Sequence, residues 1–353
     1  MLWQRLLFGS LMIVALVGLV WLDARVSGPG RGVARMLPAL PGPADRAAIP
    51  TLPRLAPASD DLPATAGLPI TLLVVVLAVF ASIELGRLIR GGPGPLDAPQ
   101  VAASPTGYEP VVAWAVVISA GLAFLPWVEL QVRLGRMGEA RLVELVNYGL
   151  SPTLMWLGGG FLGTALLVLA RRTTERAVGN MAATLFILCY IGLLASFAVR
   201  VRTIWPGAAG AGLLVYWVMT VKCSDIGAYF TGRAIGRHKL APWLSPGKTV
   251  EGAFGAILGS ILFAAGGLAL WSHLSPTLGP APLSYAQAVI FGAVIAVSGH
   301  LGDLVESAIK RDVGSKDSAR VVPAFGGLLD ILDSPLFTAP IAWWLLTFWT
   351  RMD

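Results

Sequence analysis

Charged side chains gather near the C-terminal end of the sequence, between two long apolar runs. Residues 310–334 read KRDVGSKDSARVVPAFGGLLDILDS and hold four cationic residues, four aspartates and a Gly-Gly pair. Just upstream, Asp303, Glu306, Ser307 and Lys310 recur at spacings of three and four, so on a helix they share one face. Carboxylates without a nearby Cys or His cluster suit Mg²⁺. We therefore predict a site for cations and phosphates; a solvated loop is the alternative, although it would not need acids beside apolar helix ends.

Two more ionisable residues, Lys222 and Asp225, interrupt the apolar segment VYWVMTVKCSDIGAYFTGR. Their spacing of three residues places them on one helix face. An ionisable side chain inside a membrane span is costly unless it is paired or faces water, and such residues commonly serve a function. We interpret them as functional residues. The alternatives are a structural ion pair and a Lys222 that simply reaches the interface.

A phosphate-binding element is indicated by GRAIGRHKLAPWLSPGKTVEG, residues 232–252. This is not a Walker A motif, because Pro242 stands where that motif requires glycine. However, Lys248 and Thr249 directly precede a predicted helix that begins at Val250, and backbone N–H groups at a helix start attract anions. A turn followed by Thr249 as N-cap is the other interpretation of the same residues.

Composition indicates the class of protein that must position these residues. Of the 353 residues, 56% are hydrophobic and 13% are charged, against roughly 25% charged in a soluble domain. Apolar runs close to the ~20 residues that a helix needs to cross a bilayer recur along the chain. They occupy residues 6–22, 68–86, 110–128, 152–170, 180–199, 207–230, 250–272, 284–304 and 334–350. We predict an all-α, polytopic integral membrane protein with about nine transmembrane helices, because barrel strands would be short and alternating.

The order of segments predicts three regions. Residues 1–66 combine an uncleaved membrane anchor with a tether rich in Pro, Ala and Gly. Residues 67–205 contain the N-terminal transmembrane helices, and residues 206–353 form the C-terminal catalytic region. Loops 231–249 and 305–333 hold four basic residues each, whereas loop 273–283 has none. The charged loops therefore share one face, predicted to be the cytoplasmic face of the membrane.

Several other functions are disfavoured. The formal charge of +6 does not require an acidic partner, because surplus Lys and Arg often anchor loops facing anionic lipid. No basic-aromatic pattern indicates nucleic-acid binding. The two cysteines and three histidines show no metal-ligand spacing.

From about residue 206 to the end, the sequence resembles the phosphatidate cytidylyltransferase (CDP-diacylglycerol synthase) family. That family's signature reads Ser-x-aliphatic-Lys-Arg, four residues, Lys-Asp, then a turn leading to His-Gly-Gly-aliphatic-x-Asp-Arg-aliphatic-Asp. The matching positions are Ser307, Lys310, Arg311, Lys316, Asp317, Pro323, Gly326, Gly327, Asp330 and Asp333. KCSDIGAYFTGR and HKLAPWLSPGKTVEG are also similar to family segments. Two positions differ: Phe325 replaces the usual His, and Ile331 the usual Arg.

The resemblance implies an enzyme that joins CTP to phosphatidic acid, giving CDP-diacylglycerol and pyrophosphate. Metal binding, to Mg²⁺ and a second cation, is assigned to Asp303, Asp330 and Asp333. Catalytic roles are assigned to Lys310, Arg311, Ser307, Lys316 and Asp317. Substrate binding is assigned to Lys222, Asp225, Lys248, Thr249, Gly326 and Gly327. The expected partners are CTP, phosphatidic acid and membrane lipids, with no nucleic acid; a homodimer is left open.

The two departures do not remove the chemistry. A phosphate monoester has a second pKa of about 6, so it is already an anion and needs no general base. Loss of the Arg removes a bidentate phosphate contact, and a paralogue with an altered substrate is the alternative. A second alternative function is that of a CTP-dependent lipid kinase such as dolichol kinase. A transporter that relays ions through Lys222, Asp225, Asp303 and Glu306 is the third, although no inverted repeat supports it.

Overall fold

The structure, a computed structural model, describes residues 17–27, 65–91, 109–133, 152–170, 172, 176–205, 207–314 and 327–350. These residues are nearly all helical, as the apolar runs predict. Seven helices among them are long and apolar enough to cross a membrane. They span Leu68–Ile89, Pro110–Val132, Pro152–Ala170, Ala177–Arg202, Val250–His273, Tyr285–Asp312 and Leu329–Thr350. The chain is therefore a helical, polytopic integral membrane protein.

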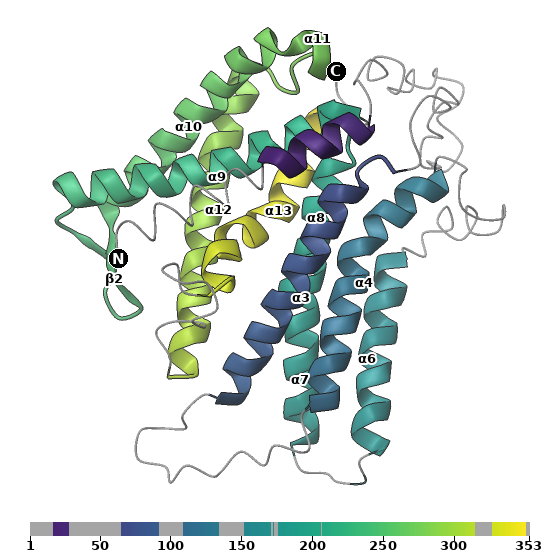
Figure 1. Cartoon of the computed structure of the whole chain (residues 1–353). Coiled ribbons are helices and arrows are strands. Elements are labelled where there is room, and N and C mark those ends of the chain that lie inside the picture. Colours follow the sequence, from purple (N-terminus) through teal and green to yellow (C-terminus); the bar gives the residue numbers. More distant parts are fainter. Residues whose placement is uncertain are drawn as a thin grey trace, which may run out of the picture.

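The helices form two groups that meet at α13 (Figure 1). The N-terminal group comprises α3 (Leu68–Gly91), α4 (Glu109–Arg133), α6 (Pro152–Ala170) and the continuous helix of α7 (Ala177–Ile187), the π-helical η2 (Leu188–Leu193) and α8 (Leu194–Arg202). The C-terminal group comprises α9 (Gly207–Ile235), α10 (Val250–His273), the short α11 (Ser275–Leu278), α12 (Tyr285–Asp312) and α13 (Leu329–Thr350). Because α13 packs against both α12 and α8, it joins the two groups.

Between α9 and α10 the chain forms an antiparallel hairpin, β1 (Lys239–Ala241) and β2 (Ser245–Thr249), where we expected a loop. Strand β2 runs directly into α10. Thr249 is extended, and its hydroxyl accepts a hydrogen bond from the N–H of Gly252 at 3.1 Å. This N-cap confirms the predicted helix start at Val250 and places Lys248 two residues before it.

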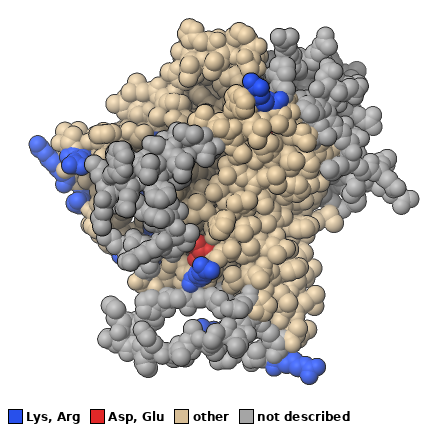
Figure 2. All heavy atoms as spheres, in the orientation of Figure 1, with Lys and Arg blue, Asp and Glu red and all other residues tan. Residues whose placement is uncertain are grey.

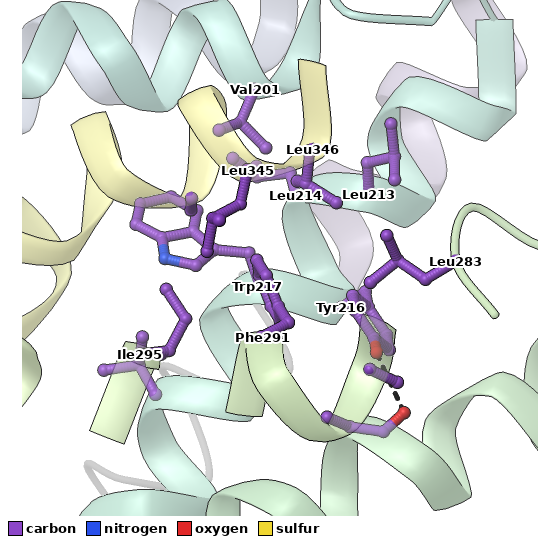
Figure 3. Close-up of a cluster of buried hydrophobic side chains, with 14 of the residues drawn as sticks. Val201, Leu213, Leu214, Tyr216, Trp217, Leu283, Phe291, Ile295, Leu345 and Leu346 are labelled. Carbon is purple, nitrogen blue, oxygen red and sulfur yellow. Dashed lines mark hydrogen bonds between the residues drawn. The ribbon is translucent and has the colours of Figure 1, made fainter. Parts of the chain in front are cut away.

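Large aromatic side chains on α9 and α12 build the core of the C-terminal group (Figure 3). The rings of Tyr216 and Phe291 stack with their centroids 5.7 Å apart. The Tyr216 hydroxyl donates to the carbonyl oxygen of Ala264 at 2.8 Å, and the indole N–H of Trp217 donates to the hydroxyl of Thr338 at 3.1 Å. These hydrogen bonds offset the cost of burying the hydroxyl of Tyr216 and the indole N–H of Trp217. The aromatic side chains can therefore pack α9 against α10, α12 and α13.

Residues 17–27 form a helix that is attached to α8 and to the start of α3. The buried guanidinium of Arg202 donates to the fully buried carboxylate of Asp23 at 2.6 Å and to the hydroxyl of Ser27 at 2.8 Å. Ser27 in turn accepts the N–H of Gly67 at 3.0 Å. The end of the predicted N-terminal anchor is thus part of the packed structure.

Eight of the nine predicted apolar runs coincide with described helices. The run 6–22 lies mostly outside the described residues, and α9, though helical as predicted, is not among the seven long apolar spans of the described part. The number nine therefore stays a prediction. Both boundaries of the predicted loop 305–333 are wrong. Helix α12 continues to Asp312, and α13 begins at Leu329, so Asp330 and Asp333 lie in a helix.

Candidate functional site

The facing surfaces of α12 and α13 carry the charged residues of the C-terminal motif. The Lys310 ammonium lies 2.9 Å from the carboxylate of Glu306 on its own helix and 2.8 Å from that of Asp330 on α13. Two turns earlier on α12, Asp303 accepts a hydrogen bond from the hydroxyl of Ser334 on α13. Asp303 and Asp330, both predicted metal ligands, therefore lie on the facing sides of one helix pair.

A glycine allows these two helices to approach closely. A Cβ at Gly302 would lie 2.7 Å from the Cβ of Phe337 and 3.0 Å from the carbonyl oxygen of Asp333. Asp333, the third predicted metal ligand, is buried, and its carboxylate accepts the N–H of Ser334 at 2.7 Å. Any larger residue at position 302 would push α13 away from the acidic surface of α12.

The β-hairpin brings a second lysine to this surface. The Lys248 ammonium lies 3.0 Å from the Asp303 carboxylate, and both side chains are more than three-quarters buried. Because Thr249 caps α10 immediately after Lys248, the backbone is held where the lysine reaches α12. The residue predicted to bind phosphate thus pairs with a residue predicted to bind metal.

Helix α9 contributes Lys222 and Asp225, whose charged groups are 3.2 Å apart, as their spacing predicts. The Lys222 ammonium also donates to the carbonyl oxygen of Ile331 at 3.4 Å. Pro335 explains why this carbonyl is free: proline has no N–H, so it cannot bond the residue four positions earlier in α13. Lys222 therefore contacts the backbone of α13 at Ile331.

A further acidic residue, Glu84 on α3, was not predicted. Its buried carboxylate accepts the backbone N–H of Leu328 at 2.8 Å and that of Leu329 at 3.3 Å. A sequence signal existed, because Glu84 is the only charged residue in the apolar run 68–86. The argument applied to Lys222 and Asp225 applies equally to it.

The structure brings most predicted site residues together. Gly327 donates its N–H to Asp330 at 2.9 Å, Ser307 is half-buried, and Arg311 is exposed near the end of α12. Five positions of the motif lie outside the described residues: Lys316, Asp317, Pro323, Phe325 and Gly326. The catalytic, substrate-binding and metal-binding roles assigned to the site residues all stay predictions.

We define the charged site as the residues that converge here: Lys222, Lys248, Lys310, Asp225, Asp303, Glu306, Asp330 and Asp333. The set holds five carboxylates and three lysines, and both kinds of side chain are partly withdrawn from water. On the face shown in Figure 2, the acidic atoms of the described residues form one small patch beside a basic side chain, within a mostly uncharged surface. The fold and the charged site define a helical, polytopic membrane protein in which lysines and carboxylates gather at α12 and α13.

Comparison with known proteins identifies the family. The sequence model of the cytidylyltransferase family matches residues 63–349, which is most of the chain. The chain belongs to this family.

Curated relatives from bacteria match the chain over part of its length. A phosphatidate cytidylyltransferase of Bacillus subtilis is 34% identical over 46% of this chain and 56% of its own length. One of Mycobacterium leprae is 37% identical over 48% of this chain and 50% of its own. The uncharacterized protein YnbB of Escherichia coli is 40% identical over 39% of this chain and 44% of its own. The chain thus spans about half the length of the curated relatives it matches.

Proposed function

We propose that this protein is a phosphatidate cytidylyltransferase, an enzyme that makes CDP-diacylglycerol and pyrophosphate from CTP and phosphatidic acid. The observation that carries the proposal is the convergence of lysines and carboxylates from α9, β2, α12 and α13 beside membrane-spanning helices. Such a site suits one substrate whose acyl chains stay in the bilayer and another that arrives from water. The names of the Bacillus subtilis and Mycobacterium leprae relatives support the same reaction.

In this reaction a phosphatidate oxygen attacks the α-phosphorus of CTP, and the bond to the β-phosphate breaks. Phosphoryl-group chemistry of this kind depends on in-line positioning and charge neutralisation more than on covalent help. Lys248 and Lys310 are held by carboxylates within the charged site. We propose that their ammonium groups exchange those carboxylates for substrate phosphate oxygens, and that the exposed Arg311 adds charge at the end of α12.

The residues fit a magnesium cofactor that is shared with the nucleotide. Mg²⁺ is usually bound by one or two carboxylates together with substrate phosphates. Within the described residues no three His, Cys, Asp or Glu side chains form a group that could hold a metal by themselves. However, the buried Glu306 keeps one carboxylate oxygen, Oε1, without a hydrogen-bond partner there. Of Asp303, Asp330 and Asp333, one or two carboxylates would bind each ion together with substrate phosphate oxygens, and the ion would supply positive charge to the triphosphate.

The replacement of the family's Arg by Ile331 is compatible with activity. The Ile331 carbonyl oxygen lies 3.4 Å from the Lys222 ammonium, so a cation is present beside this position. We propose that Lys222 supplies part of the charge that the arginine would provide. Lys222 is a point charge without the bidentate geometry of arginine, so phosphate would be held less rigidly.

We also propose that the protein resides in a bacterial cytoplasmic membrane with the charged site facing the cytoplasm. The two basic loops 231–249 and 305–333 support this orientation, and the relatives named above are bacterial. The homodimer stays a prediction.

The test is an assay of purified protein in detergent or nanodiscs with phosphatidic acid, CTP and Mg²⁺. Wild type should make CDP-diacylglycerol, and Asp303→Asn and Asp330→Asn should each lower the rate by about 100-fold or more, as for other groups that stabilise developing charge. Asp312→Asn, an exposed position at the end of α12, is the matched control and should retain the wild-type rate. A folded wild type that makes no CDP-diacylglycerol would refute the proposal.

The same assay separates the other candidate functions. Two samples of CTP are used, one labelled in cytidine and one labelled at the γ-phosphate. A lipid product labelled from cytidine indicates cytidylyl transfer, whereas a lipid product labelled only from the γ-phosphate indicates a lipid kinase. Ion flux in liposomes without CTP turnover would instead indicate a transporter.

A further inference from the structure

The start of α13 lacks a capping residue of its own. The first N–H groups of a helix have no partner within the helix and are usually bound by a Ser, Thr, Asp or Asn just before it. Here Leu328 occupies that position, and its side chain cannot accept a hydrogen bond. Glu84 supplies the missing acceptor from another helix, since both of its carboxylate oxygens bind backbone N–H groups at Leu328 and Leu329.

This cap determines the position of residues in the charged site. Asp330 follows the capped residues directly, and its own carboxylate bonds the N–H of Gly327 at 2.9 Å and the Lys310 ammonium at 2.8 Å. Three backbone N–H groups in a row, from Gly327 to Leu329, are therefore bound by two carboxylates. If Glu84 releases its two, the first turn of α13 can fray, and Asp330 loses the backbone that aims it at Lys310.

Burial makes the contact strong. Glu84 is 4% exposed and Leu329 is fully buried, so water cannot readily replace the hydrogen bond at Leu329. A negative charge at a helix N-terminus also interacts favourably with the helix dipole. The interaction with the helix dipole requires a charged carboxylate, and the two hydrogen bonds require two accepting oxygens.

We infer that Glu84 is a positioning residue for the charged site: it caps α13 from α3 and thereby holds Asp330 in place. The inference concerns the geometry of the site and, for its catalytic consequence, rests on the proposed function. The inference also gives the N-terminal group of helices a role: through Glu84 on α3 it would hold the start of α13 without contacting a substrate.

The first test is hydrogen–deuterium exchange of the full-length protein in nanodiscs without substrates. Glu84→Gln keeps the side-chain shape but leaves one accepting oxygen and no charge. We expect faster exchange in peptides that cover residues 327–332, and unchanged exchange in α10 and α12. Ser82→Ala is the matched control, because Ser82 is equally buried on α3 and its hydroxyl has no hydrogen-bond partner among the described residues. Wild-type exchange at residues 327–332 in Glu84→Gln would overturn the inference.

The second test is the cytidylyltransferase assay. Loss of a residue that orients a ligand-binding side chain typically lowers activity by about 10- to 100-fold. We expect Glu84→Gln to lower kcat within this range and to raise the Mg²⁺ concentration needed for half-maximal rate, with the KM for phosphatidic acid unchanged. Ser82→Ala should match wild type. A wild-type kcat and Mg²⁺ dependence in Glu84→Gln would also overturn the inference.

The two tests separate the inference from the proposed function. If wild type has no cytidylyltransferase activity, the proposed function fails, and the exchange experiment alone decides the role of Glu84. If Glu84→Gln exchanges rapidly everywhere, Glu84→Asp, which keeps the charge, is measured instead. Local deprotection at residues 327–332 in that variant supports the inference, whereas global deprotection in both variants would show a general folding role and overturn it.

Discussion

The buried ion pair between Asp23 and Arg202 allows a quantitative prediction. The side chain of Asp23 is 0% exposed and that of Arg202 is 2% exposed, with 2.6 Å between their charged groups. Removing one partner of such a pair leaves an uncompensated buried charge, which costs about 3–5 kcal/mol. Asp23→Ala should therefore lower the free energy of unfolding by this amount, because Ser27 and the Trp205 carbonyl can offer Arg202 only neutral acceptors.

The assay is a denaturant titration of purified protein in detergent, read by tryptophan fluorescence. Arg25→Ala, on the exposed side of the same helix, is the control. Its guanidinium lies 4.2 Å from the centroid of the Trp21 ring, so the free energy of unfolding should change by no more than about 1 kcal/mol. The double variant Asp23→Ala with Arg202→Met should be more stable than Asp23→Ala alone, because no charge is left buried. A loss below about 1 kcal/mol in Asp23→Ala, or a double variant no more stable than the single one, would refute the reasoning.

Two further predictions concern the hairpin and the contact of α9 with α10. Lys248→Met removes one cation from the charged site and should lower the rate of CDP-diacylglycerol formation by about 100-fold. Lys239 is exposed on the same hairpin, so Lys239→Met should leave the rate unchanged. Equal rates for the two variants would contradict the role of Lys248. Gly227→Ala would place a Cβ 2.3 Å from the carbonyl oxygen of Gly255, so it should destabilise the protein by about 1–3 kcal/mol. Gly266→Ala on α10 meets no atom within 4 Å and should retain the wild-type melting temperature, and equal melting temperatures for the two variants would argue against this close packing.

Local patterns in the sequence predicted the helices and the residues that share a helix face. Apolar runs long enough to cross a bilayer became helices, because in lipid the backbone must satisfy its hydrogen bonds within the segment. The i, i+3 and i+4 spacings correctly placed Lys222 with Asp225 and Glu306 with Lys310, since helix geometry alone determines those pairs. The N-cap at Thr249 was predictable for the same reason.

The start of α13 could not be predicted from its own residues. AFGGLLDILDS offers two glycines and no capping side chain before Leu329, so the segment was assigned to a loop. The N–H groups of Leu328 and Leu329 are bound instead by Glu84, a residue 244 positions from Leu328. A local pattern contains no information about such a partner.

What the sequence by itself determined is the class of protein, its membrane helices and the chemical types gathered in its C-terminal motifs. Only the tertiary structure decided which of these groups meet. Lys248 pairs with Asp303 across 55 residues, and Lys222 reaches the carbonyl of Ile331 across 109. These contacts depend on which helices are neighbours and how closely they approach, and that is set by side-chain shape, by small residues such as Gly302 and by a carbonyl freed by Pro335.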